Sequence, residues 1–118
     1  MCRLRSLFVA EGARFTGYDE HGLVEVGEKI SIGRGAKTCA IATAAMIGGR
    51  QTFVVFRRGT AWVFKVNNEH AKAIVDGERL AEFGAFESRP IHDGSVIELL
   101  HAHTDEVLHR FRVELDDD

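Results

Sequence analysis

The chain has 118 residues, of which 45% are hydrophobic and 28% are charged, and its formal net charge at pH 7 is −3. These values are typical of a single water-soluble globular domain and do not fit a disordered or membrane-embedded chain. The acidic balance also argues against a general nucleic-acid-binding protein, which needs a basic face to displace counterions from phosphates.

The beginning of the chain shows no recognisable signal peptide, because two early arginines are followed only by a brief apolar run at residues 7–10. The longest uncharged apolar stretch, residues 38–49, is too short and too rich in Ala and Gly to cross a bilayer. Cys2 and Cys39 have no metal-type spacing, so we expect two free thiols. Together these features predict a cytoplasmic protein of one domain, residues 1–118.

The first half of the chain alternates between apolar and polar residues in short runs that break at Gly, Asn and Asp. This pattern predicts strands at residues 4–9, 13–18, 23–26 and 29–32. Residues 40–46 fit either a strand or a small helix.

Two runs rich in β-branched and aromatic residues follow, at 50–56 and 60–66. Between them, Arg57-Arg58-Gly59 reads as a short hairpin turn that contains glycine. The residues that would share the buried face of the second strand are Trp62, Phe64 and Val66.

The strongest hairpin signal is Asp76-Gly77, which lies between the strand-like segments 73–75 and 78–80. This dipeptide accepts the positive φ angles of a two-residue type I′ turn. The preceding residues, 67–73, fit either one turn of helix or a loop.

Residues 95–100 predict a further strand, and residues 107–115 alternate as expected of a strand with one buried face that closes the sheet. In total, about ten short strands at intervals of about 8–12 residues predict an all-β sandwich or barrel.

Three segments in this order resemble the forkhead-associated (FHA) domain, a phosphothreonine-recognising β-sandwich of eleven strands in two sheets. They are Ile30-Ser-Ile-Gly-Arg-Gly35, the span 62–80 from the tryptophan to the end of the Asp-Gly hairpin, and Ile91-His-Asp-Gly-Ser-Val-Ile-Glu-Leu99. The resemblance covers about residues 23–115. It implies an all-β, two-sheet antiparallel sandwich of about ten to eleven strands (FHA/SMAD-like) and a protein or peptide partner. In bacteria, divergent domains of this kind are often parts of signalling or secretion assemblies.

Members of the family that bind phosphothreonine use an Arg after the Gly, a Ser-x-x-His motif, and an Asn flanked by Ser or Thr. Arg34 matches the first feature. Ser-x-x-His falls on residues 49–52, where the Ser is absent and Thr52 replaces the His; Ala71 replaces the Asn. The candidate phosphate- or partner-binding residues are Arg34, Lys37, Thr38, Arg50, Thr52, His70 and Lys72.

These departures favour a protein-interaction module that binds its partner independently of phosphothreonine. The alternative is recognition of phosphothreonine or another anion through Arg34 with a rearranged set of contacts, and a third interpretation makes Arg34 a surface residue that braces a loop. The oligomeric state and the identity of the partner stay open.

His101-x-His103 places two imidazoles on one side of the chain, but no third ligand has a recognisable spacing, so no metal site is expected. The sequence also lacks the common motifs of nucleophilic, phosphoryl-transfer and zinc enzymes. We therefore expect no catalytic residues, no cofactor, no nucleic-acid partner and no membrane span.

Overall fold

The computed structural model describes residues 1–35, 37–47, 51–80 and 88–116. Within these ranges the chain forms twelve β-strands. They are β1 (Cys2–Val9), β2 (Phe15–Thr16), β3 (Leu23–Val26), β4 (Lys29–Gly33), β5 (Ile41–Thr43), β6 (Phe53–Arg58), β7 (Ala61–Val66), β8 (Ala73–Val75), β9 (Glu78–Leu80), β10 (Ser88–Ile91), β11 (Val96–Leu100) and β12 (Val107–Leu115).

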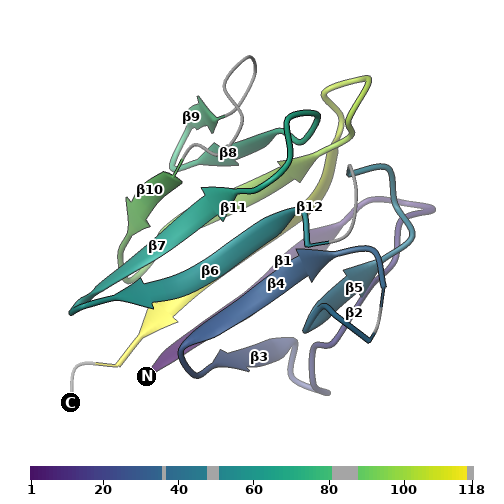
Figure 1. Ribbon diagram of the computed structural model, residues 1–118. Helices are drawn as coiled ribbons and strands as arrows, with labels where there is room; N and C mark the ends of the chain where they lie inside the picture. The colour runs from purple at the N-terminus through teal and green to yellow at the C-terminus, as the bar shows by residue number, and fades with distance from the viewer. Residues whose placement is uncertain (36, 48–50, 81–87, 117–118) are drawn as a thin grey trace.

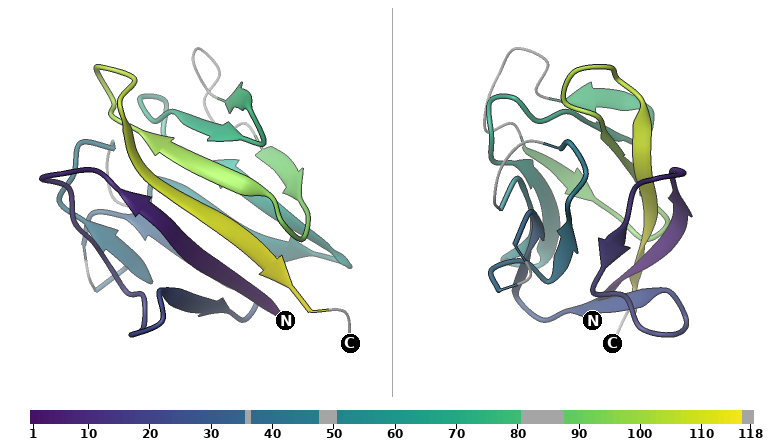
Figure 2. Two further views of the ribbon diagram at one scale, coloured as in Figure 1. Left: turned by 180° about the vertical axis from the view of Figure 1, so that it is seen from behind. Right: turned by 90° about the vertical axis from the view of Figure 1, so that its right-hand side faces the viewer.

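The strands form two six-stranded sheets that lie face to face, as the two views of Figure 2 show. The first sheet has the order β3-β1-β12-β11-β8-β9, and the second has the order β10-β7-β6-β4-β5-β2. All pairings are antiparallel except that of β4 with β5, which is parallel. The predicted all-β sandwich is therefore confirmed. The described residues form no helix, and so none that is long and apolar enough to cross a membrane.

The structure corrects the sequence-based elements in three places. The first hairpin turn is Gly59-Thr60, not Arg57-Arg58-Gly59, because Arg58 still pairs with Ala61 and Gly59 takes the positive φ of 64°. The last strand, β12, lies inside its sheet between β1 and β11, so it does not close the sheet edge. β10 was not predicted, since Pro90 interrupts its pattern and the strand lies at an edge, where proline is tolerated.

The two ambiguous segments are also resolved. Residues 40–46 contain the strand β5, and residues 67–72 form a loop with turns and no helix. β5 pairs with the end of β4, so β4 lies between β6 and β5 in the second sheet.

Aromatic side chains fill the space between the two sheets. As predicted, Trp62, Phe64 and Val66 share the buried face of β7. The ring of Phe64 lies 5.6 Å from that of Phe53 and 6.5 Å from that of Phe111, measured between centroids, so one aromatic chain joins both sheets.

The cysteines are free and buried within the described chain. Burial raises the pKa of the Cys2 thiol to about 11, which keeps it protonated at neutral pH.

The Asp76-Gly77 turn has the predicted positive φ angles, 49° and 86°. The Asp76 carboxylate accepts hydrogen bonds from the Ser95 hydroxyl and from the backbone N–H of Val96, both at 2.9 Å. The hydroxyl of Ser95 in turn accepts a bond from the N–H of His92 at 2.9 Å. Two of the three segments that carry the family resemblance are thus bonded directly to each other.

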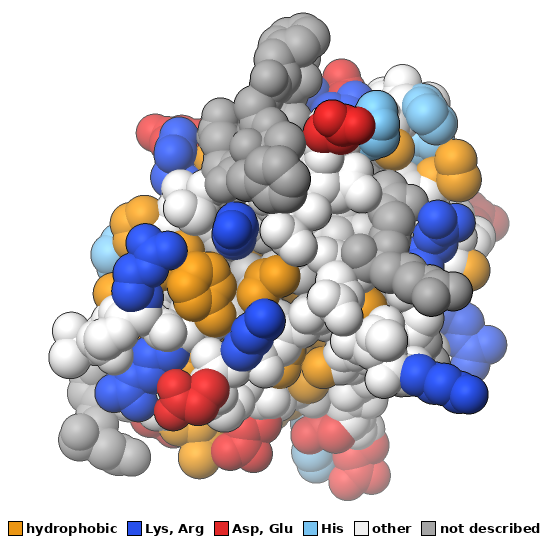
Figure 3. Space-filling model, viewed as in Figure 1, with side chains coloured by type: hydrophobic (Ala, Val, Ile, Leu, Met, Phe, Trp, Pro, Cys, Tyr) orange, Lys and Arg blue, Asp and Glu red, His pale blue; other side chains and the backbone are white. Residues whose placement is uncertain are grey.

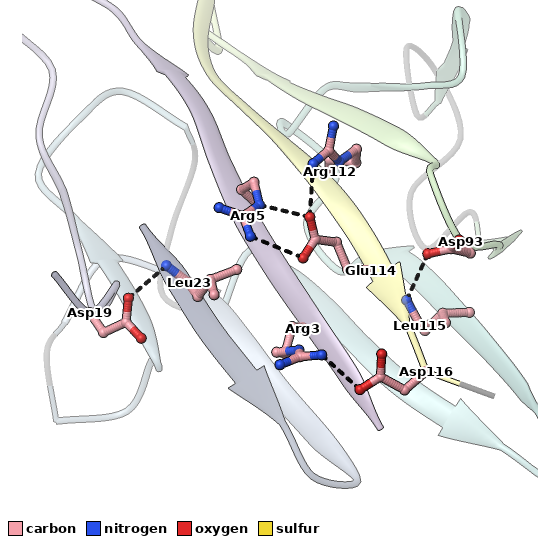
Figure 4. A network of polar contacts seen from close by, with 9 residues as sticks. All are labelled: Arg3, Arg5, Asp19, Leu23, Asp93, Arg112, Glu114, Leu115 and Asp116. Carbon is pink, nitrogen blue, oxygen red and sulfur yellow. Dashed lines mark hydrogen bonds and ion pairs between the residues drawn. The ribbon is translucent and has the colours of Figure 1, made fainter. Parts of the chain in front are cut away.

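Charged side chains on the outer face of the first sheet pair across its strands (Figure 4). Arg5 and Arg112 both contact the carboxylate of Glu114, at 2.7 and 2.8 Å, and Arg3 contacts Asp116 at 2.7 Å. These hydrogen bonds, first from Arg5 and then from Arg112, lower the pKa of Glu114 to about 2. The charged side chains on the outer face of this sheet are therefore held in ion pairs across its strands.

Candidate functional site

The loops that the resemblance implicates in binding gather toward the right-hand end of the molecule in Figure 1. They are the described parts of loops 34–40, 44–52 and 67–72, which follow β4, β5 and β7. Backbone bonds hold them together: the N–H of Asn67 donates to the carbonyl of Thr52 at 2.8 Å, and the N–H of Ala102 donates to that of Met46 at 2.7 Å. We call these loops, together with the β11–β12 loop at 101–106, the loop end.

Arg34 begins the first of these loops, immediately after β4, and its side chain is exposed. Within the described part of the chain, its guanidinium forms no ion pair or side-chain hydrogen bond. The backbone turns sharply behind it, because the N–H groups of Thr38 and Cys39 both donate to the carbonyl of Gly35 at 3.1 Å. Gly35 has a φ of 108°, which only glycine adopts readily.

Lys37 and Thr38 lie on the same turn and are both exposed. The Thr38 hydroxyl donates to the carbonyl of Gly35 at 3.3 Å, so it already serves as a cap for the turn. The ammonium of Lys37, in contrast, forms no hydrogen bond or ion pair with the described residues.

The far end of this loop is fixed against the segment after β2. A Cβ atom added to Gly17, whose φ is 114°, would lie 1.9 Å from the carbonyl oxygen of Ala40. The N–H of Ala40 donates to the carbonyl of Ser31 on β4 at 3.0 Å. Loop 34–40 is thus anchored at both ends, and Arg34 projects from a defined turn.

The β7–β8 loop is organised by an asparagine that the family comparison did not single out. The side-chain oxygen of Asn68 accepts from the N–H of His70 at 2.8 Å, and its carbonyl accepts from the N–H of Ala71 at 3.1 Å. His70 is exposed and lies 3.3 Å from the carboxylate of Glu69. Ala71 is completely buried in the core, so its side chain contributes nothing to the exposed surface of the loop.

Lys72 follows Ala71 and is tied to an acid. Its ammonium lies 2.5 Å from a carboxylate oxygen of Asp105, which also contacts the guanidinium of Arg79 at 2.9 Å. The hydrogen bond from Lys72, followed by that from Arg79, lowers the pKa of Asp105 below its ordinary value. The cation of Lys72 is therefore already neutralised within the fold.

Two candidates lie near the start of β6. Thr52 is entirely buried, and its carbonyl accepts the bond from Asn67, so it supports the loop from inside and does not form part of the exposed surface. Arg50 lies outside the described residues.

The loop end also contains a basic residue that sequence reasoning missed. Arg14 is exposed and, with Thr16, Gly35 and Thr43, lines a hollow of about 260 Å³ beside the Arg34 turn. Arg14 precedes the resemblance, which begins near residue 23, and only the pairing of β2 with β5 brings it here.

The histidines divide into exposed and structural ones. His101 and His103 lie on the β11–β12 loop with ring centroids 5.8 Å apart, and the described residues contain no group of three or more His, Cys, Asp or Glu side chains placed to hold a metal. His109 is fully buried: its Nδ1 donates to the carbonyl of Phe8 at 2.8 Å, and its Nε2 accepts from the Tyr18 hydroxyl at 2.6 Å. Burial lowers the pKa of His109 to about 4.

No protein-family model matches this chain, and no curated protein matches it either. Solved structures do. The solution structure of the FHA domain of a hypothetical protein from Arabidopsis thaliana is similar, with a TM-score of 0.66 and 16% identity, over 99% of this chain and 86% of that one. The crystal structure of the FhaA FHA domain, complexed with the intracellular domain of Rv3910, has a TM-score of 0.64 and 15% identity, over 97% of this chain and 100% of that one.

Proposed function

Because the chain has the fold of a forkhead-associated domain, we propose that it is a protein-interaction module that binds its partner without requiring phosphothreonine. The FhaA domain was solved with a protein partner, which supports a protein partner for this chain as well. We also propose that the chain acts by binding and not by catalysis, and that it does so in the cytoplasm.

The observation that carries this proposal is the state of the positions that would grip a phosphopeptide. Ala71, at the position of the family's Asn, is buried and has no polar group. Thr52 is buried as well, and the ammonium of Lys72 is held by Asp105. Arg34, which matches the family's Arg after the Gly, is exposed.

The loss of these contacts is large in energetic terms. A hydrogen bond to a charged group contributes about 1.5–3 kcal/mol, so two missing bonds remove about 3–6 kcal/mol of binding free energy. This corresponds to an affinity lower by about 100-fold to 10⁴-fold. The exposed carboxylate of Glu69 on the same loop would also repel a phosphate.

One observation favours a second candidate function, recognition of an anion. Arg34 has no acidic partner among the described residues, Lys37 is exposed on the same turn, and Arg14 lines a hollow that the neighbouring Gly35 also lines. A guanidinium in this setting can offer two parallel N–H donors to a phosphate or carboxylate. In this case Arg14, Lys37 and Thr38 would replace the contacts that the family normally uses.

A selection from two matched peptide libraries separates the two functions. One library has phosphothreonine at a fixed central position and the other has threonine there, and both are offered to the chain and to its Arg34→Ala variant. We expect peptides from the threonine library to bind as well as their phosphorylated counterparts, and the variant to retain them.

Enrichment confined to the phosphothreonine library, and lost in Arg34→Ala, would contradict the leading proposal and support anion recognition. Because Arg34 is exposed and forms no described side-chain contact, the variant should keep the fold of the parent chain, which an amide spectrum can verify.

A further inference from the structure

The outer face of the second sheet differs from that of the first in its charge. On β6, Phe53 and Val55 face the core, so Val54, Phe56 and Arg58 face outward. The pairing registers place Lys29 of β4 beside Phe56, and Lys65 of β7 beside Val54. We define the basic sheet face by the outward residues Lys29, Val54, Phe56, Arg58, Val63 and Lys65.

The strands of this sheet contain no acidic residue at any described position, from β2 and β4 through β5, β6 and β7 to β10. In the first sheet, by contrast, Glu98 pairs with Arg110 at 2.9 Å and Glu114 pairs with two arginines. The strands of the first sheet thus pair their cations with carboxylates, whereas the described strands of the second sheet supply cations and no carboxylate.

The basic sheet face also presents apolar surface. Phe56 is half-buried, and the guanidinium of Arg58 lies 5.3 Å from its ring centroid. Figure 3 shows hydrophobic side chains over β6 and β7 among Lys and Arg side chains, with acidic side chains toward the rim. Lys29 is exposed and forms no ion pair with the residues that the structure describes.

A shallow pocket lies in the middle of this face. It has a volume of about 210 Å³ and is lined by Lys29, Val54, Phe56, Lys65 and Asn67. Val54 and Phe56 give it an apolar lining and Lys29 adds an exposed cation, which suits an apolar group flanked by negative charge.

We propose that the basic sheet face binds an acidic protein segment that places one large apolar side chain in this pocket. The argument is charge complementarity: Lys29 and Arg58 form no ion pair with the described residues and attract a negative partner, and the apolar lining of the pocket supplies the burial that stabilises a bound complex. This inference rests on the proposed function and specifies the surface and the chemistry of the partner.

An acidic protein segment fits better than a nucleic acid. The face has three cations and the whole chain carries a net charge of −3, whereas a nucleic acid site requires a broad basic surface that neutralises several phosphates. An apolar pocket would also contribute nothing to contacts with a phosphate backbone.

The test uses a displayed library of random unphosphorylated peptides, selected on the intact chain. We expect the enriched peptides to be rich in Asp and Glu and to contain one Leu, Ile, Phe or Trp. The double variant Lys29→Glu/Arg58→Glu should bind these peptides more weakly by about tenfold or more.

The matched control is Arg34→Glu/Lys37→Glu, which makes the same change of charge at the loop end and should leave binding within about twofold of the parent. All four positions are exposed, so both variants should give the amide spectrum of a folded chain.

Four results would overturn the inference: no enrichment, enriched peptides without acidic residues, binding that survives reversal of the sheet face, or binding of phosphatidylserine vesicles or single-stranded RNA in place of peptides. If reversal at the loop end alone removes the peptides, the sheet-face inference fails and the proposed function stands. If binding appears only with phosphothreonine peptides, the proposed function itself fails.

Discussion

At the scale of single residues, the environment of each side chain determines whether it remains available to a partner. Arg34 and Lys37 are exposed and form no described ion pair, whereas Lys72 is neutralised by Asp105 and Ala71 is enclosed by the core. The replacement of Asn by Ala at position 71 was readable in the sequence. The Lys72–Asp105 pair was not, because the two residues are 33 positions apart and meet only when β11 and β8 are side by side.

His109 gives a prediction about stability and pH. Its pKa is about 4 in the folded chain, compared with 6.5 for an ordinary histidine, so between these values the unfolded chain binds a proton that the folded chain does not. The free energy of unfolding should therefore fall as the pH is lowered from about 6.5 to about 4, by up to about 3 kcal/mol, and then show no further contribution from this group.

Urea unfolding of the parent chain and of His109→Leu at a series of pH values measures this effect. Other titrating groups are common to both proteins, so the difference between the two curves isolates His109. Parallel curves between pH 6.5 and 4 would show that the histidine is not held neutral by its burial.

At the scale of elements, close approaches of backbone fix the loops to the sheets. Gly17 lies against the carbonyl of Ala40 so closely that no side chain fits, and this contact anchors the loop that begins at Arg34. The sequence predicted a strand at residues 13–18 and left residues 40–46 open between strand and helix. It did not predict the contact, since a glycine of this kind looks the same in the sequence as a glycine in an open turn.

Gly17→Ala should therefore destabilise the fold by about 3 kcal/mol or more, because the new methyl group overlaps a backbone atom and the φ is also unfavourable. Gly12→Ala is the matched control: its φ is also positive, at 85°, but a Cβ there meets no atom within 4 Å. We expect it to cost about 1 kcal/mol. Equal losses in thermal or urea unfolding would show that the close approach to Ala40 has no energetic role.

The Asp76 carboxylate gives a second prediction at this scale. Asp76→Ala removes the bonds from Ser95 and Val96 that join the β8–β9 turn to β11, and should lower the free energy of unfolding by about 2 kcal/mol. Asp76→Asn keeps one acceptor oxygen and should lose less. If Asn and Ala variants unfold at the same urea concentration, the carboxylate does not connect the two segments as described.

At the scale of the whole molecule, hydrophobic alternation predicted an all-β sandwich or barrel, because each strand buries one face. The choice of a two-sheet sandwich came from the resemblance to the forkhead-associated domain. Alternation could not predict which strands are neighbours, so the interior position of β12 and the placement of Arg14 in one hollow with Gly35 both depended on tertiary pairing. The basic sheet face also depends on strand pairing. Its residues come from the separate strands β4, β6 and β7, and only the pairing registers bring them together on one acid-free surface.

The proposed function requires that this chain, which has the fold of FHA domains, binds its partner without a phosphate. Titration of the ¹⁵N-labelled chain with a peptide pool that carries phosphothreonine, and separately with the same pool carrying threonine, tests this most directly at the amides of Arg34, Lys37 and Thr38. We predict that the two pools cause the same shifts at these amides. Saturable shifts there that appear only with phosphothreonine, and disappear in Arg34→Ala, would contradict the account.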